Sequence, residues 1–366
     1  MNKMIVANLV HRPVRTVISI TAVAIEVILI LLIVGLSLGM LNDGKSRQQG
    51  IGADVLVQPP GSSALVGMTG APVSIKVADV VAKLPYVEKV APVIWQLTTG
   101  GAVEVIYGID YRSYNDLVGF HFLEGGPFQG PWDVIVDDVF AYGKGKHVGA
   151  EVEIMNHNFR ICGIVEHGKG ARKFLSMQTM QDLIGAQGKA SVFYVKTDTA
   201  QHANLVVDEV HDVPGMERYT VRSMREYLSM MTPEKVPGLS QFIVVVIAIS
   251  VVIGFIVLFQ SMYTAVLERT REIGILKALG ASKLYILNVI LRETLALAVV
   301  GAALGIVASF VVRLMIRARF PTLPIQIGPT WIAYAVVIAI VGALLGAIYP
   351  AAKAALKDPV DAIAYE

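Results

Sequence analysis

Four long runs of apolar residues constrain the fold of this chain more than any other feature. They cover residues 17–41, 242–266, 285–312 and 331–350. A helix needs about 20 residues to cross a hydrocarbon core roughly 30 Å thick, and each run is long enough. The first run also exceeds the ~7–15 apolar residues of a typical signal peptide, so we expect it to be retained. The sequence therefore predicts a multi-pass α-helical membrane protein with four transmembrane helices.

Composition and charge exclude several classes of protein. Hydrophobic residues make up 54% and charged residues 16% of the chain, whereas soluble domains average about 25% charged residues. The 31 basic and 29 acidic residues leave a net charge of +2, so no strong overall field would attract nucleic acid. Cys162 is the single cysteine, which excludes an intramolecular disulfide and a cysteine-cluster zinc site. The chain is not an ordinary soluble enzyme.

Basic residues in the short connecting segments predict the orientation. Cytoplasmic loops carry an excess of Lys and Arg. If residues 1–16, 267–284 and 351–366 are cytoplasmic, these segments hold nine Lys and Arg residues, whereas the outer loop 313–330 holds three. The nine are Lys3, Arg12, Arg15, Arg269, Arg271, Lys277, Lys283, Lys353 and Lys357. Both termini are therefore expected in the cytoplasm, with residues 42–241 on the other side of the membrane.

The three outer arginines need their own explanation. Arg313 and Arg317 are four residues apart and share a helix face, and Arg319 follows them. They could bind the phosphates of lipid headgroups, or they could simply anchor the end of the third helix at the interface. The sequence leaves both interpretations open.

Residues 42–241 have ordinary polar composition and predict a large extracytoplasmic α+β domain. Strand, helix and strand patterns follow one another at residues 55–57, 77–84 and 90–97, and again at 192–195, 203–210 and 218–221. A short pattern repeats between them, with Pro85 and Pro214 both followed two residues later by Val or Met and then Glu, at an offset of 214 − 85 = 129. Two β-α-β halves of this kind could form one ferredoxin-like layer. Alternating residues near 100–175 predict an inserted small β subdomain.

One motif resembles a nucleotide site but does not fit its context. Residues 39–46 match the phosphate-binding pattern G-x-x-x-x-G-K-[ST], and Asp137 and Asp138 follow an apolar strand pattern. A phosphate loop must leave a buried strand and open a helix, whereas this one follows a membrane helix and faces outward in the predicted topology. We also find no catalytic signature and no metal-ligand spacing. No cofactor site is therefore expected in this chain.

The segment between the second and third apolar runs carries the clearest functional signal. If residues 267–283 are helical, Ile273, Leu276 and Lys277 share one face and Gly280 can end the helix. A charged positive-inside loop would account for the same residues. The more specific interpretation is a short amphipathic helix that docks into a groove of a soluble partner.

Residues 268–281 resemble the cytoplasmic loop E-R-x-R-E-I-G-I-L-x-A-L-G-A of FtsX-like permeases, a family of ABC transporter subunits that includes macrolide-exporter and lipoprotein-release permeases. Arg12-Pro13 before the first helix, Tyr349-Pro350 and Asp358-Pro359 resemble the same family, as does a domain placed after the first of four helices. The resemblance implies a set of residues that couple to an ATPase: Glu268, Arg269, Arg271, Glu272, Ile273, Gly274, Leu276, Lys277, Leu279 and Gly280.

The same resemblance implies how the protein works. It implies a permease homodimer with a separate cytoplasmic ATPase that binds ATP and Mg²⁺, and motion passed mechanically to the external domain. The cargo could be a lipid, lipoprotein, peptide or drug, and a periplasmic adaptor could take part. An alternative is a membrane-anchored sensor whose cytoplasmic loop binds a partner other than an ATPase. A third interpretation, an integral membrane hydrolase, has no set of catalytic side chains in the sequence to support it.

Glycine spacing and one acid mark the interior of the helix bundle. Three pairs stand four residues apart, which lets helix backbones approach closely; they are Gly35 and Gly39, Gly301 and Gly305, and Gly342 and Gly346. Glu26 is the only charge in the first run, and an ionised carboxylate there costs at least ~2–3 kcal/mol. It should be protonated, paired or facing a polar cavity, with either a proton or substrate role or a hydrogen-bonded packing role.

Overall fold

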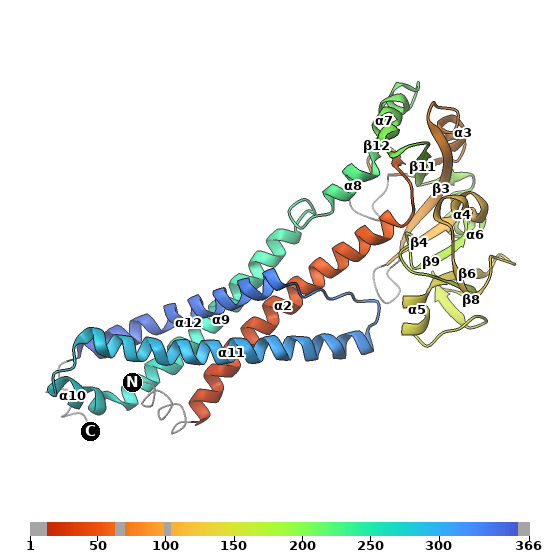
Figure 1. Ribbon diagram of the computed structural model, residues 1–366. Helices are drawn as coiled ribbons and strands as arrows, with labels where there is room; N and C mark the ends of the chain where they lie inside the picture. Colours follow the sequence, from red (N-terminus) through yellow and green to blue (C-terminus); the bar gives the residue numbers. More distant parts are fainter. Residues whose placement is uncertain (1–12, 63–69, 99–103, 358–366) are drawn as a thin grey trace. The chain divides into compact units, whose positions relative to one another are not determined.

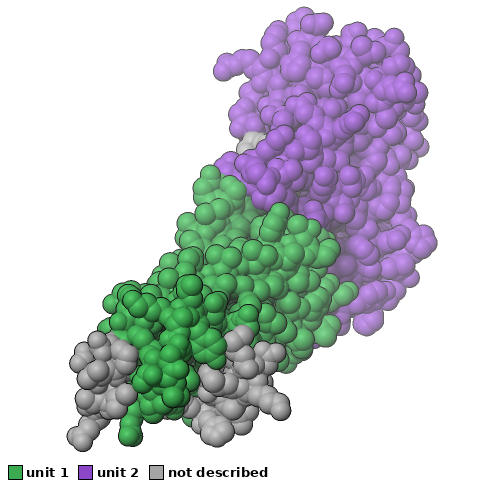
Figure 2. Space-filling view, turned by 60° about the vertical axis from the view of Figure 1, so that its left-hand side comes forward, with its two compact units in different colours: residues 1–38, 238–317, 325–366 green, residues 39–237, 318–324 purple. Residues whose placement is uncertain are grey.

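The computed structural model describes residues 13–62, 70–98 and 104–357 and divides the chain into two compact units (Figure 2). The membrane unit comprises Met1–Leu38, Gly238–Arg317 and Ile325–Glu366, and the domain comprises Gly39–Pro237 with Ala318–Pro324. Lys3, Arg12 and Asp358-Pro359 lie outside the described residues. Each unit is described by itself below.

Within the described residues, four helices are long and apolar enough to cross a membrane (Figure 1). They are α2 (Pro13–Gln49), α9 (Leu239–Glu268), α11 (Lys283–Arg319) and α12 (Pro329–Leu356), with the short helix α10 (Thr270–Ala278) between α9 and α11. A buried core of aliphatic side chains from α2, α9, α11 and α12 holds the bundle together. The predicted membrane fold is confirmed. Helices α2 and α11 extend eight and seven residues past the ends of their apolar runs, 41 and 312, because hydropathy marks only the apolar part of a helix.

The domain contains a ten-stranded mixed sheet. Two β-α-β units form one end of it: β1 (Val55–Gln58), α3 (Val77–Val81) and β3 (Val87–Thr98), then β11 (Val192–Thr197), α7 (Ala203–Asp212) and β12 (Thr220–Ser223). Their strands lie in the order β12-β1-β11-β3 with antiparallel neighbours. This interleaving of two β-α-β units is the ferredoxin-like arrangement.

The residues between the two units continue the same sheet and do not form a sheet of their own. β4 (Glu104–Ile109) pairs with β3, and the order continues through β9 (Lys173–Ser176), β6 (Asp133–Asp137), β8 (His157–Val165) and β5 (Phe122–Gly125). β7 (Glu151–Ile154) pairs with β8, and β2 (Val73–Ser74) forms a separate small sheet with β10 (Lys189–Ala190). The helices of this region are α4 (Tyr111–Val118), α5 (Asp138–Gly143) and α6 (Met177–Ile184), and α8 (Met224–Met230) follows β12. The strands that were predicted to form a separate subdomain therefore extend the same sheet, because residues 93–98 of β3 pair with β4.

The short sequence repeat has a conformational basis. After Pro85 and Pro214 the chain turns through Tyr86 and Gly215, which occupy equivalent positions and have φ of 64° and 90°. Glycine adopts this left-handed region without steric cost, whereas a tyrosine does so at some expense. Both turns follow a helix that packs on the same apolar cluster of the sheet. The repeat therefore marks two equivalent helix-to-strand turns.

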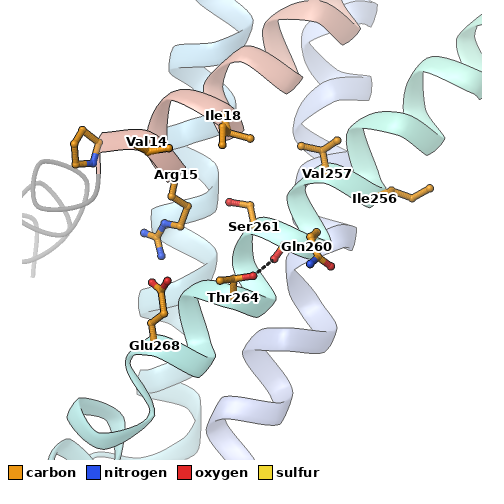
Figure 3. A pocket seen from close by; sticks show the side chains of 10 residues that line it. Val14, Arg15, Ile18, Ile256, Val257, Gln260, Ser261, Thr264 and Glu268 are labelled. Carbon is orange, nitrogen blue, oxygen red and sulfur yellow. Dashed lines mark hydrogen bonds between the residues drawn. The ribbon is translucent and has the colours of Figure 1, made fainter.

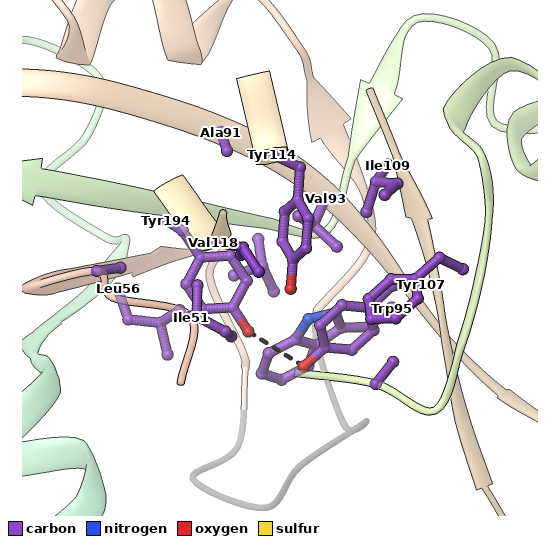
Figure 4. Close-up of a cluster of buried hydrophobic side chains, with 14 of the residues drawn as sticks. Ile51, Leu56, Ala91, Val93, Trp95, Tyr107, Ile109, Tyr114, Val118 and Tyr194 are labelled. Atoms are coloured by element: carbon purple, nitrogen blue, oxygen red, sulfur yellow. Dashed lines mark hydrogen bonds between the residues drawn. The ribbon is translucent and has the colours of Figure 1, made fainter. Parts of the chain in front are cut away.

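Aromatic side chains fill the centre of the domain core (Figure 4). Tyr107, Tyr114 and Tyr194 are fully buried beside Trp95. The hydroxyl groups of Tyr107 and Tyr194 are 3.1 Å apart and hydrogen-bonded. Tyr114 donates its hydroxyl proton to the carbonyl oxygen of Lys169 at 2.9 Å. Buried hydroxyls of this kind are tolerated because each finds a partner.

The last turns of α2 belong to the domain core. Gln48 donates from Nε2 to the hydroxyl of Tyr107 at 2.8 Å and accepts from the hydroxyl of Tyr194 at 2.9 Å. Arg172 binds Asp43 of α2 and Asp137 at the end of β6, each at 3.0 Å. These residues follow the predicted boundary at residue 42, and the compact domain begins only slightly earlier, at Gly39.

Candidate functional site

Helix α10 lies between the second and third long helices, where the amphipathic pattern predicts it. Arg269 separates α9 from α10, and Gly280, with φ of 94°, follows its last turn. The backbone N–H of Gly280 donates to the carbonyl of Lys277, and that of Ala281 donates to the carbonyl of Leu276, each at 3.0 Å. These two bonds form a Schellman motif, which needs a left-handed residue at this place. Gly280 ends the helix as predicted.

One face of α10 packs on the membrane unit. Gly274 is buried, and Ile273 and Leu276 pack on an apolar cluster that includes Met262 and Ile286. Lys277 donates from Nζ to the carbonyl of Ala355 at 2.9 Å and also to the carbonyl of Lys357. A cation at the carbonyl end of α12 interacts favourably with the helix dipole. Three of the predicted coupling residues and this lysine thus hold α10 in place.

A buried carboxylate fixes the other end of α10. Glu293 of α11 is 1% exposed, and its two oxygens accept from Arg15 of α2 at 2.7 Å and from Arg269 at 2.9 Å. Charge-assisted bonds are stronger than neutral ones, and here they join three helices at one point. The sequence alone does not reveal these partners, because the two arginines are 278 and 24 residues away.

The first turns of α2 and the last turns of α9 border a groove of about 820 Å³ (Figure 3). Arg15 from α2 and Glu268 from α9 point toward each other across it. Ser19 and Ser261 connect the same two helices through a hydroxyl–hydroxyl bond of 2.6 Å. Glu268, which the family pattern assigns to ATPase coupling, therefore also lies beside the end of α2.

The opposite side of α10 is exposed, and we call it the outer face. It consists of Arg271, Ile275 and Leu279, which follow one another at intervals of four residues along one side of the helix. Ile275 is 46% and Leu279 81% exposed; Glu272 and Gly280 are exposed beside them. A helix that shows two aliphatic side chains and one arginine to solvent has the composition of a helix-in-groove ligand. Ile275, which was not among the predicted coupling residues, belongs to this face.

The glycine pairs differ in what they approach. Side chains at Gly301 and Gly305 of α11 would collide with α2, at distances of 2.7 Å from Val23 Cβ and 2.8 Å from the carbonyl oxygen of Ala24. A side chain at Gly346 would come within 3.0 Å of the carbonyl oxygen of Phe255 in α9. These three positions allow close helix packing.

The remaining predicted glycines have other surroundings. Gly35 lies against Ile325 and Gln326 of the loop before α12, and its carbonyl accepts from the backbone N–H of Gln326 at 2.9 Å. Gly39 is buried. Gly342 makes only ordinary contacts, 3.7 Å from Glu26 Oε1. Gly35 therefore serves a loop and not a second helix.

Glu26 lies inside the bundle between α9 and α12. It is 2% exposed, and among the described residues neither of its carboxyl oxygens has a hydrogen-bond partner. A side chain at Gly254 of α9 would overlap with Glu26 Oε2. Ser250 of α9 lines a cavity of about 330 Å³ together with Glu26. Glu26 packs closely on Gly254, a partner that the sequence pattern did not reveal, and a proton or substrate role of this acid stays a prediction.

The three outer arginines that the sequence singled out do not form a defined site in the structure. Arg313 is half-buried, and Arg317 and Arg319 are exposed, with the Arg319 guanidinium 5.8 Å from the ring centre of Phe320. Both interpretations of the outer arginines stay predictions.

Residues 39–46 are helical within α2 and cannot form a phosphate loop. Burial raises the pKa of Cys162 to about 12, so its thiol is unsuited to nucleophilic chemistry. In residues 13–62, 70–98 and 104–357 no group of three or more His, Cys, Asp or Glu side chains could hold a metal ion.

Together these features define a class of protein, an ABC transporter permease with four membrane helices and a domain after the first. Two family models match the chain, the MacB-like periplasmic core domain over residues 16–213 and the FtsX-like permease C-terminal over residues 244–359. The chain therefore belongs to the family of FtsX-like permeases with a MacB-like domain, as the loop pattern predicted.

Relatives that match in sequence agree with this membership. The macrolide export ATP-binding/permease protein MacB of Escherichia coli K12 is 29% identical over 277 residues, which are 69% of this chain and 42% of that protein. A protein of the same description from Rhodopirellula baltica is 31% identical over 182 residues, 47% of this chain and 26% of that one. The chain thus spans less than half the length of these relatives.

Among solved structures, the periplasmic region of MacB from Actinobacillus actinomycetemcomitans has a TM-score of 0.38 and 17% identity, covering 50% of this chain and 94% of that one. The extracellular domain of the ABC-type transporter YknZ from Gram-positive bacteria has a TM-score of 0.36 and 16% identity, covering 46% and 99%.

Proposed function

We propose that this chain is the permease subunit of an ABC transporter of the mechanotransmission type. A cytoplasmic ATPase, which binds ATP and Mg²⁺, docks on α10 and moves the membrane helices as it turns over. The permease acts as a homodimer in the bacterial inner membrane, with its termini in the cytoplasm and its domain outside. The cargo is a lipid, lipoprotein, peptide or drug that the domain helps to export or extract.

The single observation that carries the proposal is the division of α10 into two faces. The inner face is held by Gly274, Lys277 and the Arg269–Glu293 pair, so the helix is fixed to the bundle at both ends. On the outer face, Ile275 and Leu279 are 46% and 81% exposed. A rigidly mounted helix with an apolar exposed face is suited to receive force from a partner and pass it to α11 and α12.

Substitution of the outer face tests this function. In native membranes the wild-type chain should co-purify with an ATPase, and Leu279→Glu or Ile275→Glu should abolish that association. A charge in the centre of a helix-in-groove interface is left without a partner on burial, which costs several kcal/mol. Gly274 and Leu276 are less suitable positions because changes there would also disturb packing inside the membrane unit.

Leu205→Glu on α7 of the domain is the matched control, since Leu205 is 47% exposed and belongs to another unit. This variant should retain the ATPase. If Leu279→Glu and Leu205→Glu both kept the ATPase, docking on α10 would be wrong. Loss of a stoichiometric partner that has no ATPase activity would favour the alternative of a membrane-anchored sensor.

A further inference from the structure

A basic groove opens between α9, α10 and α12 at the end of the membrane unit that carries α10. Its volume is about 880 Å³. The walls are mainly aliphatic and aromatic, with Tyr263 and Tyr349 among them, and three lysines line it, namely Lys277, Lys353 and Lys357. None of the described residues that line it is acidic. A mainly apolar groove lined by three lysines is an unusual combination for a surface that only faces water.

Neutral groups hold two of these lysines in position. Lys353 donates from Nζ to the hydroxyl of Tyr263 at 3.0 Å and lies 4.9 Å from the centre of that ring. Lys277 is held by two backbone carbonyls at the end of α12. Among the described residues, neither Lys277 nor Lys353 forms a salt bridge to a carboxylate. Their positive charges therefore remain available to an anion from outside the chain.

The position of the groove along the helices matches the depth of lipid headgroups. The apolar runs of α9 and α12 end near residues 266 and 350, so Tyr263 and Tyr349 lie just inside that limit and Lys353 just outside it. Tyrosine rings favour the membrane interface. Phe259 stacks on Tyr263 and packs against Tyr349, with ring centres 6.0 and 5.8 Å apart. This row of aromatic side chains extends from the lysines toward the hydrocarbon core.

We propose that this groove binds an anionic phospholipid. The headgroup phosphate lies among Lys277, Lys353 and Lys357, and an acyl chain follows the aromatic wall of Tyr263 and Tyr349. Basic pockets between membrane helices are known to take anionic headgroups, and each lysine near the surface contributes a modest attraction. That the lipid comes from the cytoplasmic leaflet of the membrane follows only from the orientation proposed above. Lipid binding itself does not depend on that orientation.

Because α10 forms one wall of the groove, the bound lipid would contact the same helix that receives the ATPase. The lipid touches the inner face, through Ile273, Gly274 and Lys277, and leaves the outer face open. Lipid binding and partner docking can therefore be measured separately. A membrane rich in anionic lipid would stabilise α10 against the bundle.

Competition between two phospholipids tests the proposal. The full chain is placed in nanodiscs that contain equal amounts of phosphatidylglycerol and phosphatidylcholine, and the lipid retained on release into the gas phase is identified by native mass spectrometry. The wild-type chain should retain phosphatidylglycerol in preference to phosphatidylcholine. The double variant Lys353→Gln/Lys357→Gln lacks two positive charges. Its preference for phosphatidylglycerol should be reduced by about fivefold for each lysine removed. Inorganic phosphate, which has no acyl chain, should not compete.

Two further variants make the result decisive. Lys353→Arg keeps the charge and should keep the preference, which shows that a loss in the double variant does not come from misfolding. Lys283→Gln removes an exposed lysine at the start of α11 that does not line the groove, and it should have no effect. Equal retention of both lipids by the wild-type chain, or an equal loss in Lys283→Gln, would overturn the proposal. Association with the ATPase should persist in all of these variants, so a failure here would not be confused with a failure of the proposed function.

Discussion

Glu26 and Gly254 show how one missing side chain can fix the position of a charged group. The Glu26 carboxyl occupies the space that a side chain at Gly254 would need, so α2 and α9 can approach only because residue 254 is a glycine. The sequence made Glu26 conspicuous as the one charge in its run. It could not reveal Gly254, because α9 has no second glycine four residues away to form a recognisable pair.

A double-mutant cycle should detect this contact. Gly254→Ala should destabilise the membrane unit by about 1–3 kcal/mol, because the new methyl group overlaps with the Glu26 carboxyl. In a Glu26→Ala background the same change should cost much less, giving a coupling energy within the roughly 0.5–3 kcal/mol range of contacting residues. The measurement is the unfolding midpoint of the purified chain in detergent.

Gly44→Ala is the control for the intrinsic preference of helices for alanine, since nothing lies within 4 Å of a side chain at Gly44 in α2. Additive effects of the Glu26 and Gly254 substitutions would contradict the contact.

The sequence predicts well that helix α10 exists. It does not predict which side of the helix turns toward the bundle. The spacing of Ile273 and Leu276 and the glycine at 280 locate the helix and its end. Charges near the ends of a short loop resemble solvated ones, yet Arg269 and Lys277 both turn inward, toward Glu293 and the end of α12. Their partners are distant in sequence, so only the tertiary structure shows which residues mount the helix and which remain for a partner.

Removal of the central carboxylate should release this helix. Glu293→Ala would leave Arg15 and Arg269, with side chains 11% and 13% exposed, without the acid that joins them. Breaking a buried pair from one side costs about 3–5 kcal/mol. We expect a lower unfolding midpoint and faster tryptic cleavage near the exposed Arg271.

Glu272→Ala serves as the comparison, because it removes an exposed carboxylate of α10 itself. Equal cleavage rates in Glu293→Ala and wild-type chains would show that Glu293 does not hold α10.

For the chain as a whole, hydropathy and loop charge were sufficient to predict a four-helix membrane protein with one large inserted domain. The β-α-β patterns at both ends of the domain also follow from local alternation. The middle of the sheet does not, since β4 pairs in parallel with β9 and β6 in parallel with β8, and such pairings between distant segments leave no local signature. The orientation in the membrane stays a prediction from nine basic residues against three.

Accessibility labelling decides that orientation. The chain has one cysteine, which is buried, so Cys162→Ser provides a background without thiols. In intact cells with a permeable outer barrier, a membrane-impermeant maleimide should label a cysteine introduced at Leu205 of the domain. A cysteine at Leu279 of α10 should react only after the inner membrane is opened. Labelling of Leu279→Cys in intact cells would reverse the topology and remove the basis for docking of a cytoplasmic ATPase.

Helix α2 also determines where relatives of this protein could exchange their domains. Its residues from Gly39 to Gln49 are part of the domain, where Asp43 binds Arg172 and Gln48 joins the two core tyrosines. A chimera joined where α2 ends, after Gln49, would combine the domain core with a foreign helix end that lacks these matching residues. One joined before Gly39 would carry the matching residues along. A domain that is exchanged together with its own contacts therefore includes about three turns of α2.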